Sequence, residues 1–515
     1  MNITTRFTLL VVPLGLSFCT PNNVGAEPDT SRPNIVYILA DDLGIGDVGT
    51  FNPEGKIPTP NMDRLASEGM KFTDAHSGSA VCTPTRYGIL TGRYAWRTRL
   101  ASGVLWGYSM PLIERGRMTV ASLLQQHGYH TACIGKWHLG LEWTRRDSTI
   151  PHVDSPKEAW DNYDFAKPIV SGPLQTGFDT FFGISASLDM HPHVYIHDDH
   201  ATAVPTRIVG PSGGKAFWRE GPIGDDFRHI QVLDKLTDKA VEYVNAQSDK
   251  KPFFLYFPLT APHKPILPED RFQKKSGLNE WGDFVMQVDW TIGQVMQAVE
   301  LRGLNDNTLF IVTSDNGATP GADFAELGRK GHAPSAQFRG NKADIFEGGH
   351  RVAFIARWPE VIQAGTSSDH TICHTDLLST AAEILGYELP AAAGEDSVSM
   401  LPLMQQSLDP PLREATIHHS INGSFSIRRG QWKLCLCPGS GGWSSPRPPQ
   451  ARKQKLPPVQ LFDLSTDIAE QHNIHAEHPE LVRELTKLLQ KYIDDGRSTP
   501  GEPQPNDRDI SLTVN

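Results

Sequence analysis

The sequence has few cysteines, no excess of positive charge and no long apolar run after its first residues. Six cysteines in 515 residues, without regular spacing, do not predict a disulfide framework, so we expect buried free thiols. Lys and Arg number 48 against 59 Asp and Glu, and the net charge of −11 argues against a nucleic-acid or other broad polyanion binder. A few focused cations can still hold a small anion. We also expect no transmembrane segment.

The N-terminus predicts export. Arg6 precedes an apolar run over residues 7–18, and a small-x-small pattern follows at residues 24–26. We therefore expect residues 1–26 to be a cleaved signal peptide, and the mature protein to be periplasmic, secreted or lumenal. A lipoprotein signal around Cys19 is the alternative, which the bulky residue before it disfavours.

Apolar runs of strand length alternate with amphipathic runs of helix length. This alternation predicts an α/β fold in which helices cover both faces of a mostly parallel sheet. The expected strands are Asn34 to Ala40, Thr131 to Ile134, Phe253 to Phe257 and Thr308 to Thr313, and the expected helices are Asn61 to Gly69, Thr119 to His127 and Gly282 to Leu301.

The pattern changes after about Pro402, where short strand-like segments lead to one helix-like segment over residues 479–492. We expect a large domain over residues 33–405 and a small antiparallel α+β domain over residues 411–495. Residues 496–515 are polar and Pro-rich, which predicts a disordered tail.

Polar residues follow two of the expected strands directly. Asp41 and Asp42 end the first, and Asp315 and Asn316 end another. Ligand sites of open α/β sheets gather at the carboxyl ends of strands, so these side chains are expected to meet. An all-oxygen set of this kind suits one Ca²⁺ or Mg²⁺. A surface Asp pair in a turn is the ordinary alternative.

A second set of motifs carries cysteine and cations. The most informative is Cys82-Thr83-Pro84-Thr85-Arg86, followed by Leu90-Thr91-Gly92-Arg93. By itself it also fits a buried structural cysteine at a Pro-broken helix start. Further along are Gly135-Lys136-Trp137-His138-Leu139-Gly140, Ala261-Pro262-His263-Lys264-Pro265 and Gly340-Asn341-Lys342.

These motifs, in this order, resemble those of the sulfatase family, of the arylsulfatase type. The first matches the signature C-x-P-x-R with a following L-T-G-R, although position 85 is Thr where many members have Ser. The resemblance implies an alkaline-phosphatase-like fold. It also implies that a formylglycine-generating enzyme oxidises Cys82 to formylglycine, which joins Asp41, Asp42, Asp315 and Asn316 around the cation.

The resemblance also assigns roles to the other site residues. It implies that Arg86 steadies the nucleophile and that His138 acts near its hydroxyl. His263 would contact sulfate and protonate the leaving oxygen. The sulfate-binding set that it implies is Lys136, His263 and Lys342, with Ser187 as a looser match.

The substrate is less strongly indicated. The stretch from Ser77 to Tyr94 is most similar to the branch that removes 6-sulfate from galactose or N-acetylgalactosamine. A phosphate mono- or diester hydrolase of related fold, and a non-catalytic binder of sulfated glycans, are the alternatives. Cys82 argues against the phosphate ester hydrolase, because the phosphatases that this fold resembles have Ser or Thr at the position of the nucleophile.

Two further features have no assigned role. Histidines within residues 191–200 admit a zinc site, but their spacing fits no specific zinc pattern, so we expect a surface loop at the pocket mouth. Trp443, in a Gly-rich loop, either stacks on a sugar ring or anchors its own loop.

Overall fold

The computed structural model describes Met1 and residues 32–155, 160–407 and 413–513. The predicted signal peptide lies outside the described residues except for Met1. None of the helices formed by the described residues is both long and apolar enough to cross a bilayer.

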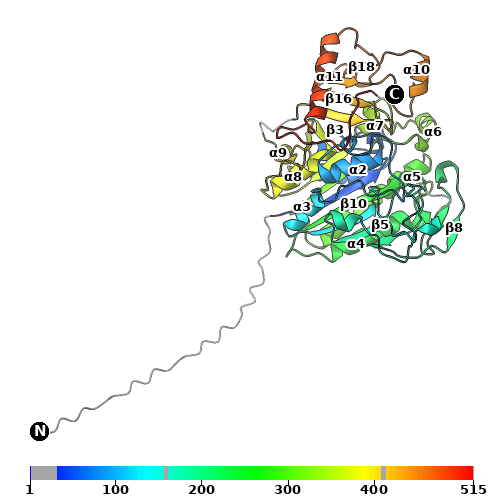
Figure 1. Ribbon diagram of the computed structural model, residues 1–515, viewed down its shortest axis with the longest axis vertical. Helices are drawn as coiled ribbons and strands as arrows, with labels where there is room; N and C mark the ends of the chain where they lie inside the picture. The colour runs from blue at the N-terminus through cyan, green and yellow to red at the C-terminus, as the bar shows by residue number, and fades with distance from the viewer. Residues whose placement is uncertain (2–31, 156–159, 408–412, 514–515) are drawn as a thin grey trace.

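A ten-stranded mixed sheet forms the centre of the molecule (Figure 1). Its middle strands β11, β1, β10, β4 and β5 are parallel, and the strands beyond β11 and β5 begin with antiparallel pairs. In spatial order the strands are β13 (Thr366–Ser368), β2 (Met70–Phe72), β12 (Phe354–Arg357), β11 (Thr308–Ser314), β1 (Asn34–Asp41), β10 (Phe253–Pro262), β4 (His130–Lys136), β5 (Thr180–Ile184), β6 (Ile196–His197) and β7 (His200–Ala201).

Helices cover both faces of the sheet, which explains why its central strands are continuously apolar. Every residue of β1 is buried. Ile35, Tyr37 and Leu39 join one core and Val36 and Ile38 the other. The first core includes α2 (Cys82–Thr91), α3 (Val120–Gln126) and α8 (Leu377–Ile384), and the second includes α1 (Pro60–Glu68), α4 (Val232–Asn245) and α5 (Glu280–Leu301). The predicted fold class is confirmed.

A smaller antiparallel sheet packs against one end of this body, as Figure 1 shows for β16, β18 and α11. It consists of β15 (Thr416–His419), β16 (Phe425–Arg429), β17 (Trp432–Cys435) and β18 (Gln460–Asp463), and it carries α11 (Pro479–Asp494). Tyr94 and Trp96 of the large body are buried in the same apolar cluster as Phe425 and Leu489. The small unit therefore shares a core with the segment that follows α2.

The segment after α11 differs from the expected disordered tail. Arg93 donates hydrogen bonds to the Pro505 carbonyl and to Asp507, and Arg97 donates to Asn506. Composition predicted disorder because the tail has few apolar residues, but its polar groups are matched by two arginines about 400 residues earlier in the chain. Cysteine behaves as expected: every cysteine that the structure describes is buried and free.

A buried ionic network joins the smaller sheet to the large body. His76 and His350 face each other with their Nδ1 atoms 3.0 Å apart, and the His418 ring stacks on His350 at 3.9 Å. Lys433 lies 3.0 Å from both His350 Nε2 and Glu347. The other charged members are Asp74, Arg351, Arg428 and Glu470.

This network predicts that acid destabilises the fold. Burial, together with neighbouring positive groups, lowers the pKa of His350 and of His418 well below the ordinary value. In the unfolded chain each imidazole takes up a proton near pH 6.5, while the folded chain keeps it neutral. The unfolded state therefore binds more protons below that pH. We expect the free energy of unfolding to fall by about 1 kcal/mol for each such histidine between pH 6.5 and 5.5, because the unfolded imidazole goes from half to nearly full protonation over that interval.

Urea unfolding of wild type and of His418→Gln at these two pH values measures the effect. The variant should be less stable at pH 6.5, yet its stability should depend less steeply on pH, because one of the titrating histidines has been removed. Equal slopes for the two proteins would show that His418 ionises alike in the folded and unfolded chains.

Candidate active site

The carboxyl ends of β1 and β11 bring four oxygen-bearing side chains together. Ala40 pairs with Ser314 in the parallel register, so the residues that follow each strand emerge side by side. The Asp42 backbone N–H donates to Asp315 Oδ1 at 3.1 Å, and Asn316 Nδ2 donates to Asp42 Oδ1 at 2.8 Å. Asp41 and its three neighbours in this acidic cluster are each at most 1% exposed.

Close backbone packing fixes the loop that carries Asp315 and Asn316. A Cβ atom at Gly317 would lie 1.8 Å from the Gly348 carbonyl oxygen. Only glycine fits there. The loop is thus fixed against α7 (Glu347–His350), which also contributes to the buried ionic network.

The acidic cluster has the properties of a cation site. Asp41 Oδ1, Asp42 Oδ2 and Asn316 Oδ1 are buried, and none of them has a hydrogen-bond partner in the part of the chain that the structure describes. The amide of Asn316 donates through its nitrogen to Asp42 and to the Gly317 carbonyl, which leaves its oxygen available. Burial and the Asp41 charge raise the pKa of Asp315 to about 7. A hard divalent cation would satisfy the three oxygens and stabilise the carboxylate charges.

Cys82 lies inside this cluster, as the first residue of α2. Its Sγ and oxygens of Asp41 and Asp315 are within 4.8 Å of one another. Burial raises the pKa of Cys82, an effect that Lys136 and Lys342 oppose. The side chain is 2% exposed and stays a thiol, which is a poor nucleophile.

Arg86 and Lys136 neutralise the carboxylates from the other side. Arg86 Nη2 donates to Asp315 at 2.7 Å, and Nη1 donates to the Lys136 carbonyl at 3.0 Å. Lys136, at the end of β4, places Nζ 2.6 Å from Asp41 and 3.0 Å from Ser187 Oγ. Both cations are fully buried.

His263 and Lys342 complete the cationic side. Lys342 Nζ lies 2.6 Å from Asp42 Oδ1. Although burial lowers the pKa of Lys342, Asp42 and other anions raise it above the ordinary value, so the ammonium stays protonated. His263 Nε2 lies 3.8 Å from Asp42, and its Nδ1 donates to the Lys264 carbonyl at 2.6 Å. Ser187 Oγ is 3.3 Å from His263, so the loosely matched serine lies in this group.

His138 presents a free ring nitrogen. Its Nε2 donates to the Leu105 carbonyl at 2.8 Å, and its Nδ1 is buried without a hydrogen-bond partner among residues 32–155, 160–407 and 413–513. Burial is the main cause that lowers the pKa of His138 well below the usual value, and the positive charges of Lys136 and Arg86 lower it further. The imidazole is therefore neutral, with Nε2 as the donor and a lone pair on Nδ1.

A cavity of about 350 Å³ opens onto the cationic side. His263 and Lys342 line it together with Lys264 of the same motif as His263 and with Trp443 from the small C-terminal unit. The lining residues that the sequence did not single out are Asp189, Phe217, Thr319, Pro320 and Gly321. Asp189 lies two residues after Ser187, and this closeness to a predicted site residue is the feature of the sequence that could have identified it. Nothing in the sequence around Phe217 indicates that it lines the cavity.

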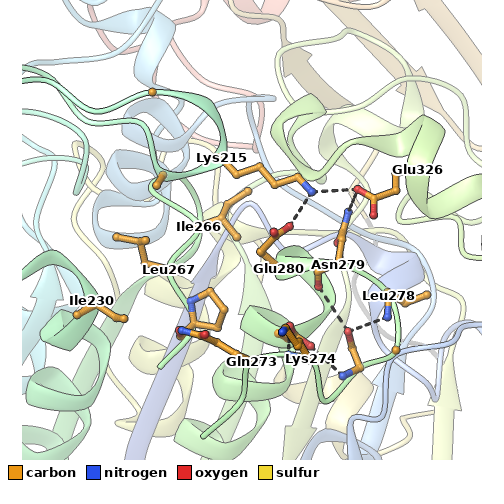
Figure 2. A pocket seen from close by; sticks show the side chains of 16 residues that line it. Lys215, Ile230, Ile266, Leu267, Gln273, Lys274, Leu278, Asn279, Glu280 and Glu326 are labelled. Carbon is orange, nitrogen blue, oxygen red and sulfur yellow. Dashed lines mark hydrogen bonds and ion pairs between the residues drawn. The ribbon is translucent and has the colours of Figure 1, made fainter. Parts of the chain in front are cut away.

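A second cavity, of about 700 Å³, contains none of the predicted site residues (Figure 2). Lys215 at its wall is paired with Glu280 at 2.8 Å and with Glu326 at 3.0 Å, and Asn279 donates to Glu326. The charges of Lys215, Glu280 and Glu326 are thus paired with one another, and the predicted site residues lie at the smaller cavity.

The histidine-rich loop differs from its expected exposure. His191 and His193 are buried, whereas the side chains of His197 and His200 are 63% and 53% exposed. Among the described residues, the groups whose ligand atoms are close enough to share a metal include none of these four. The loop gives no support to a zinc site.

Buried carboxylates, an adjoining set of cationic side chains and an open cavity lie together, and this arrangement suits a small anionic ester and a divalent cation. The sulfatase family model matches residues 33–387. A Bacteroides thetaiotaomicron N-acetylgalactosamine-6-O-sulfatase is 32% identical, over 94% of this chain and 98% of that protein. Human arylsulfatase A is 29% identical, over 94% of this chain and 90% of its own length.

A solved structure supports the same assignment. It comes from work on the metabolism of multiple glycosaminoglycans by Bacteroides thetaiotaomicron, and it matches with a TM-score of 0.76 and 32% identity. The match covers 90% of this chain and 99% of that one. The chain belongs to the sulfatase family and is a sulfuric ester hydrolase. The family match favours this activity over the two alternatives, a phosphate ester hydrolase and a non-catalytic binder of sulfated glycans.

Proposed function

We propose that this exported enzyme hydrolyses sulfate esters of carbohydrates, with 6-sulfated galactose or N-acetylgalactosamine as the first candidates. It would use a formylglycine formed from Cys82 and one Ca²⁺ or Mg²⁺. The observation that carries the proposal is the position of Cys82, which lies among Asp41, Asp315, Lys136 and Lys342. The similar N-acetylgalactosamine-6-O-sulfatase supports the choice of sugar.

Residue 82 is the proposed nucleophile, but only after modification. A buried thiol with a raised pKa suits neither attack on sulfur nor hard-cation coordination. A hydrated formylglycine there would supply one hydroxyl to attack sulfur and a second whose deprotonation releases sulfate, and the cation would make the first hydroxyl more acidic.

The neighbouring side chains would prepare the ester for attack. Lys136 and Lys342 would neutralise the sulfate oxygens, with Ser187 as a further donor. Lys342 stays protonated and can donate to the leaving oxygen, as can His263 once it carries a proton. His138, with its free Nδ1 lone pair, would accept the proton that triggers sulfate release. Arg86 would hold Asp315 in place.

The peptide that contains residue 82 gives the direct test. Protein made in a host with a formylglycine-generating system should yield a tryptic peptide with the mass of the aldehyde. A fully active preparation that contains only the unmodified thiol would contradict the proposal.

The substrate prediction needs a panel. We expect a higher kcat/KM for 6-sulfated galactose or N-acetylgalactosamine than for a generic aryl sulfate, and the lowest value for a phosphate monoester. Sugars can use the walls of the 350 Å³ cavity, which a flat aryl group leaves largely uncontacted. A faster aryl sulfate would overturn the carbohydrate assignment, and a faster phosphate ester would overturn the role proposed for the site.

A further inference from the structure

Asp189 has an unusual position at the edge of the 350 Å³ cavity. It lines this cavity with His263, Lys342 and Trp443, although its side chain is only 8% exposed. One carboxylate oxygen, Oδ2, forms an ion pair with Arg219. The other, Oδ1, is buried and has no hydrogen-bond partner among the described residues.

An unpaired buried carboxylate oxygen is costly and calls for a ligand. The same property marks Asp41 Oδ1 and Asp42 Oδ2, where a cation fits. A second cation does not fit at Asp189. Arg219 already neutralises its charge, and Asp189 belongs to none of the metal-competent groups among the described residues. A neutral hydrogen-bond donor is the remaining chemistry.

The surroundings of Asp189 are rigid and aromatic. The Arg219 guanidinium lies over the rings of Trp106 and Phe217, with its Cζ 4.9 and 5.0 Å from their centroids. The Arg219 backbone N–H also donates to the Asp189 carbonyl at 3.0 Å. Arg219 is therefore held at three points, and it fixes the orientation of the carboxylate.

Trp443 is fixed as well. Its backbone N–H donates to Asp344 Oδ1 at 2.7 Å, and the Ser444 N–H donates to the same oxygen. Its ring is 38% exposed and lines the cavity. A sugar ring carries hydroxyl groups and also has apolar faces. A preoriented carboxylate oxygen can accept a hydrogen bond from such a hydroxyl, and an exposed aromatic ring can pack against such a face.

We propose that Asp189 is a specificity-determining residue that accepts a hydrogen bond from a hydroxyl of the sulfated sugar, with Arg219 as its positioning residue. The inference rests on the proposed carbohydrate substrate. An aryl sulfate has no such hydroxyl and leaves Asp189 Oδ1 unpaired, which is how a site of this kind discriminates against it.

The test compares Asp189→Ala with wild type on a sulfated sugar and on an aryl sulfate. Loss of a hydrogen bond to a charged acceptor should lower kcat/KM for the sugar by roughly 10- to 100-fold. Turnover of the aryl sulfate should stay within about threefold, because sulfate binding and chemistry are untouched. Asp225→Ala, an exposed carboxylate with 71% of its side chain accessible, is the matched control.

Deoxy substrates identify the donor. Removal of the recognised hydroxyl should lower kcat/KM for wild type but not further for Asp189→Ala. Equal losses on sugar and aryl sulfate would show a structural role, and no loss on the sugar would overturn the inference alone. If wild type turns over aryl sulfate and no sugar sulfate, the proposed function fails and the inference fails with it.

Discussion

Replacing Cys82 by alanine should lower kcat for sulfate ester hydrolysis by at least ~10⁴-fold. Alanine can neither become formylglycine nor supply a hydroxyl beside Asp41 and Asp315. The free energy of unfolding should change by only about 1 kcal/mol, since the substitution removes only the terminal atoms of one small buried side chain. Steady-state kinetics and urea unfolding of the purified variant measure the two effects.

Cys435→Ala is the matched control. That thiol is also free and buried, but it lies in the small C-terminal sheet. It should keep near wild-type turnover at a similar cost in stability. Substantial activity in Cys82→Ala would show that another group attacks sulfur, and equal losses in both variants would point to disturbed packing.

Replacing Asp315 by alanine should remove both the cation and the activity, with a loss in kcat/KM of at least ~10³-fold. Asp315 provides one of three carboxylates around the proposed cation and is the 2.7 Å partner of Arg86. Ca²⁺ at a hundred times its Kd should stabilise wild type by about 2.7 kcal/mol, a shift that the variant should lose. Metal analysis and thermal unfolding with and without chelator measure this.

Two further variants separate the effects of charge and fold. Asp315→Asn keeps the shape of the side chain and should show an intermediate response to Ca²⁺. Asp306→Ala removes an exposed carboxylate just before β11 and should behave as wild type. Full activity in Asp315→Ala, or in metal-free wild type, would remove the basis for the cation site.

The sequence was sufficient to predict the centre of the fold, and the residues that its motifs proposed for the site lie close together in the structure. Long buried strands such as β1 and β11 are continuously apolar, and each ends at a polar motif, so strand ends and ligand positions were readable together. The edge strands β6 and β7, of two residues each, carry no periodicity and were not predicted.

Parts of the molecule that depend on distant partners were not predicted. Asp189 becomes informative only once Arg219, 30 residues later, is seen to occupy one of its oxygens. Burial of His191 likewise depends on packing against Gly221. A Cβ atom added at Gly221 would lie 2.2 Å from the Cβ of His191. Such contacts leave no local pattern in the sequence. A loop residue is chosen by the distant residue that it contacts, whereas residues of helices and strands follow a regular hydrophobic repeat.

Residues 505–507 have a consequence for the order in which the protein is assembled. They bind Arg93 and Arg97, which follow the helix that begins at Cys82. The Ala80 backbone N–H also bonds to the His419 carbonyl in the C-terminal sheet. A ribosome delivers these partners several hundred residues after Cys82, so the helix lacks its final support during most of synthesis. Residue 82, at 2% exposure in the finished fold, is accessible to another protein's active site chiefly in that interval.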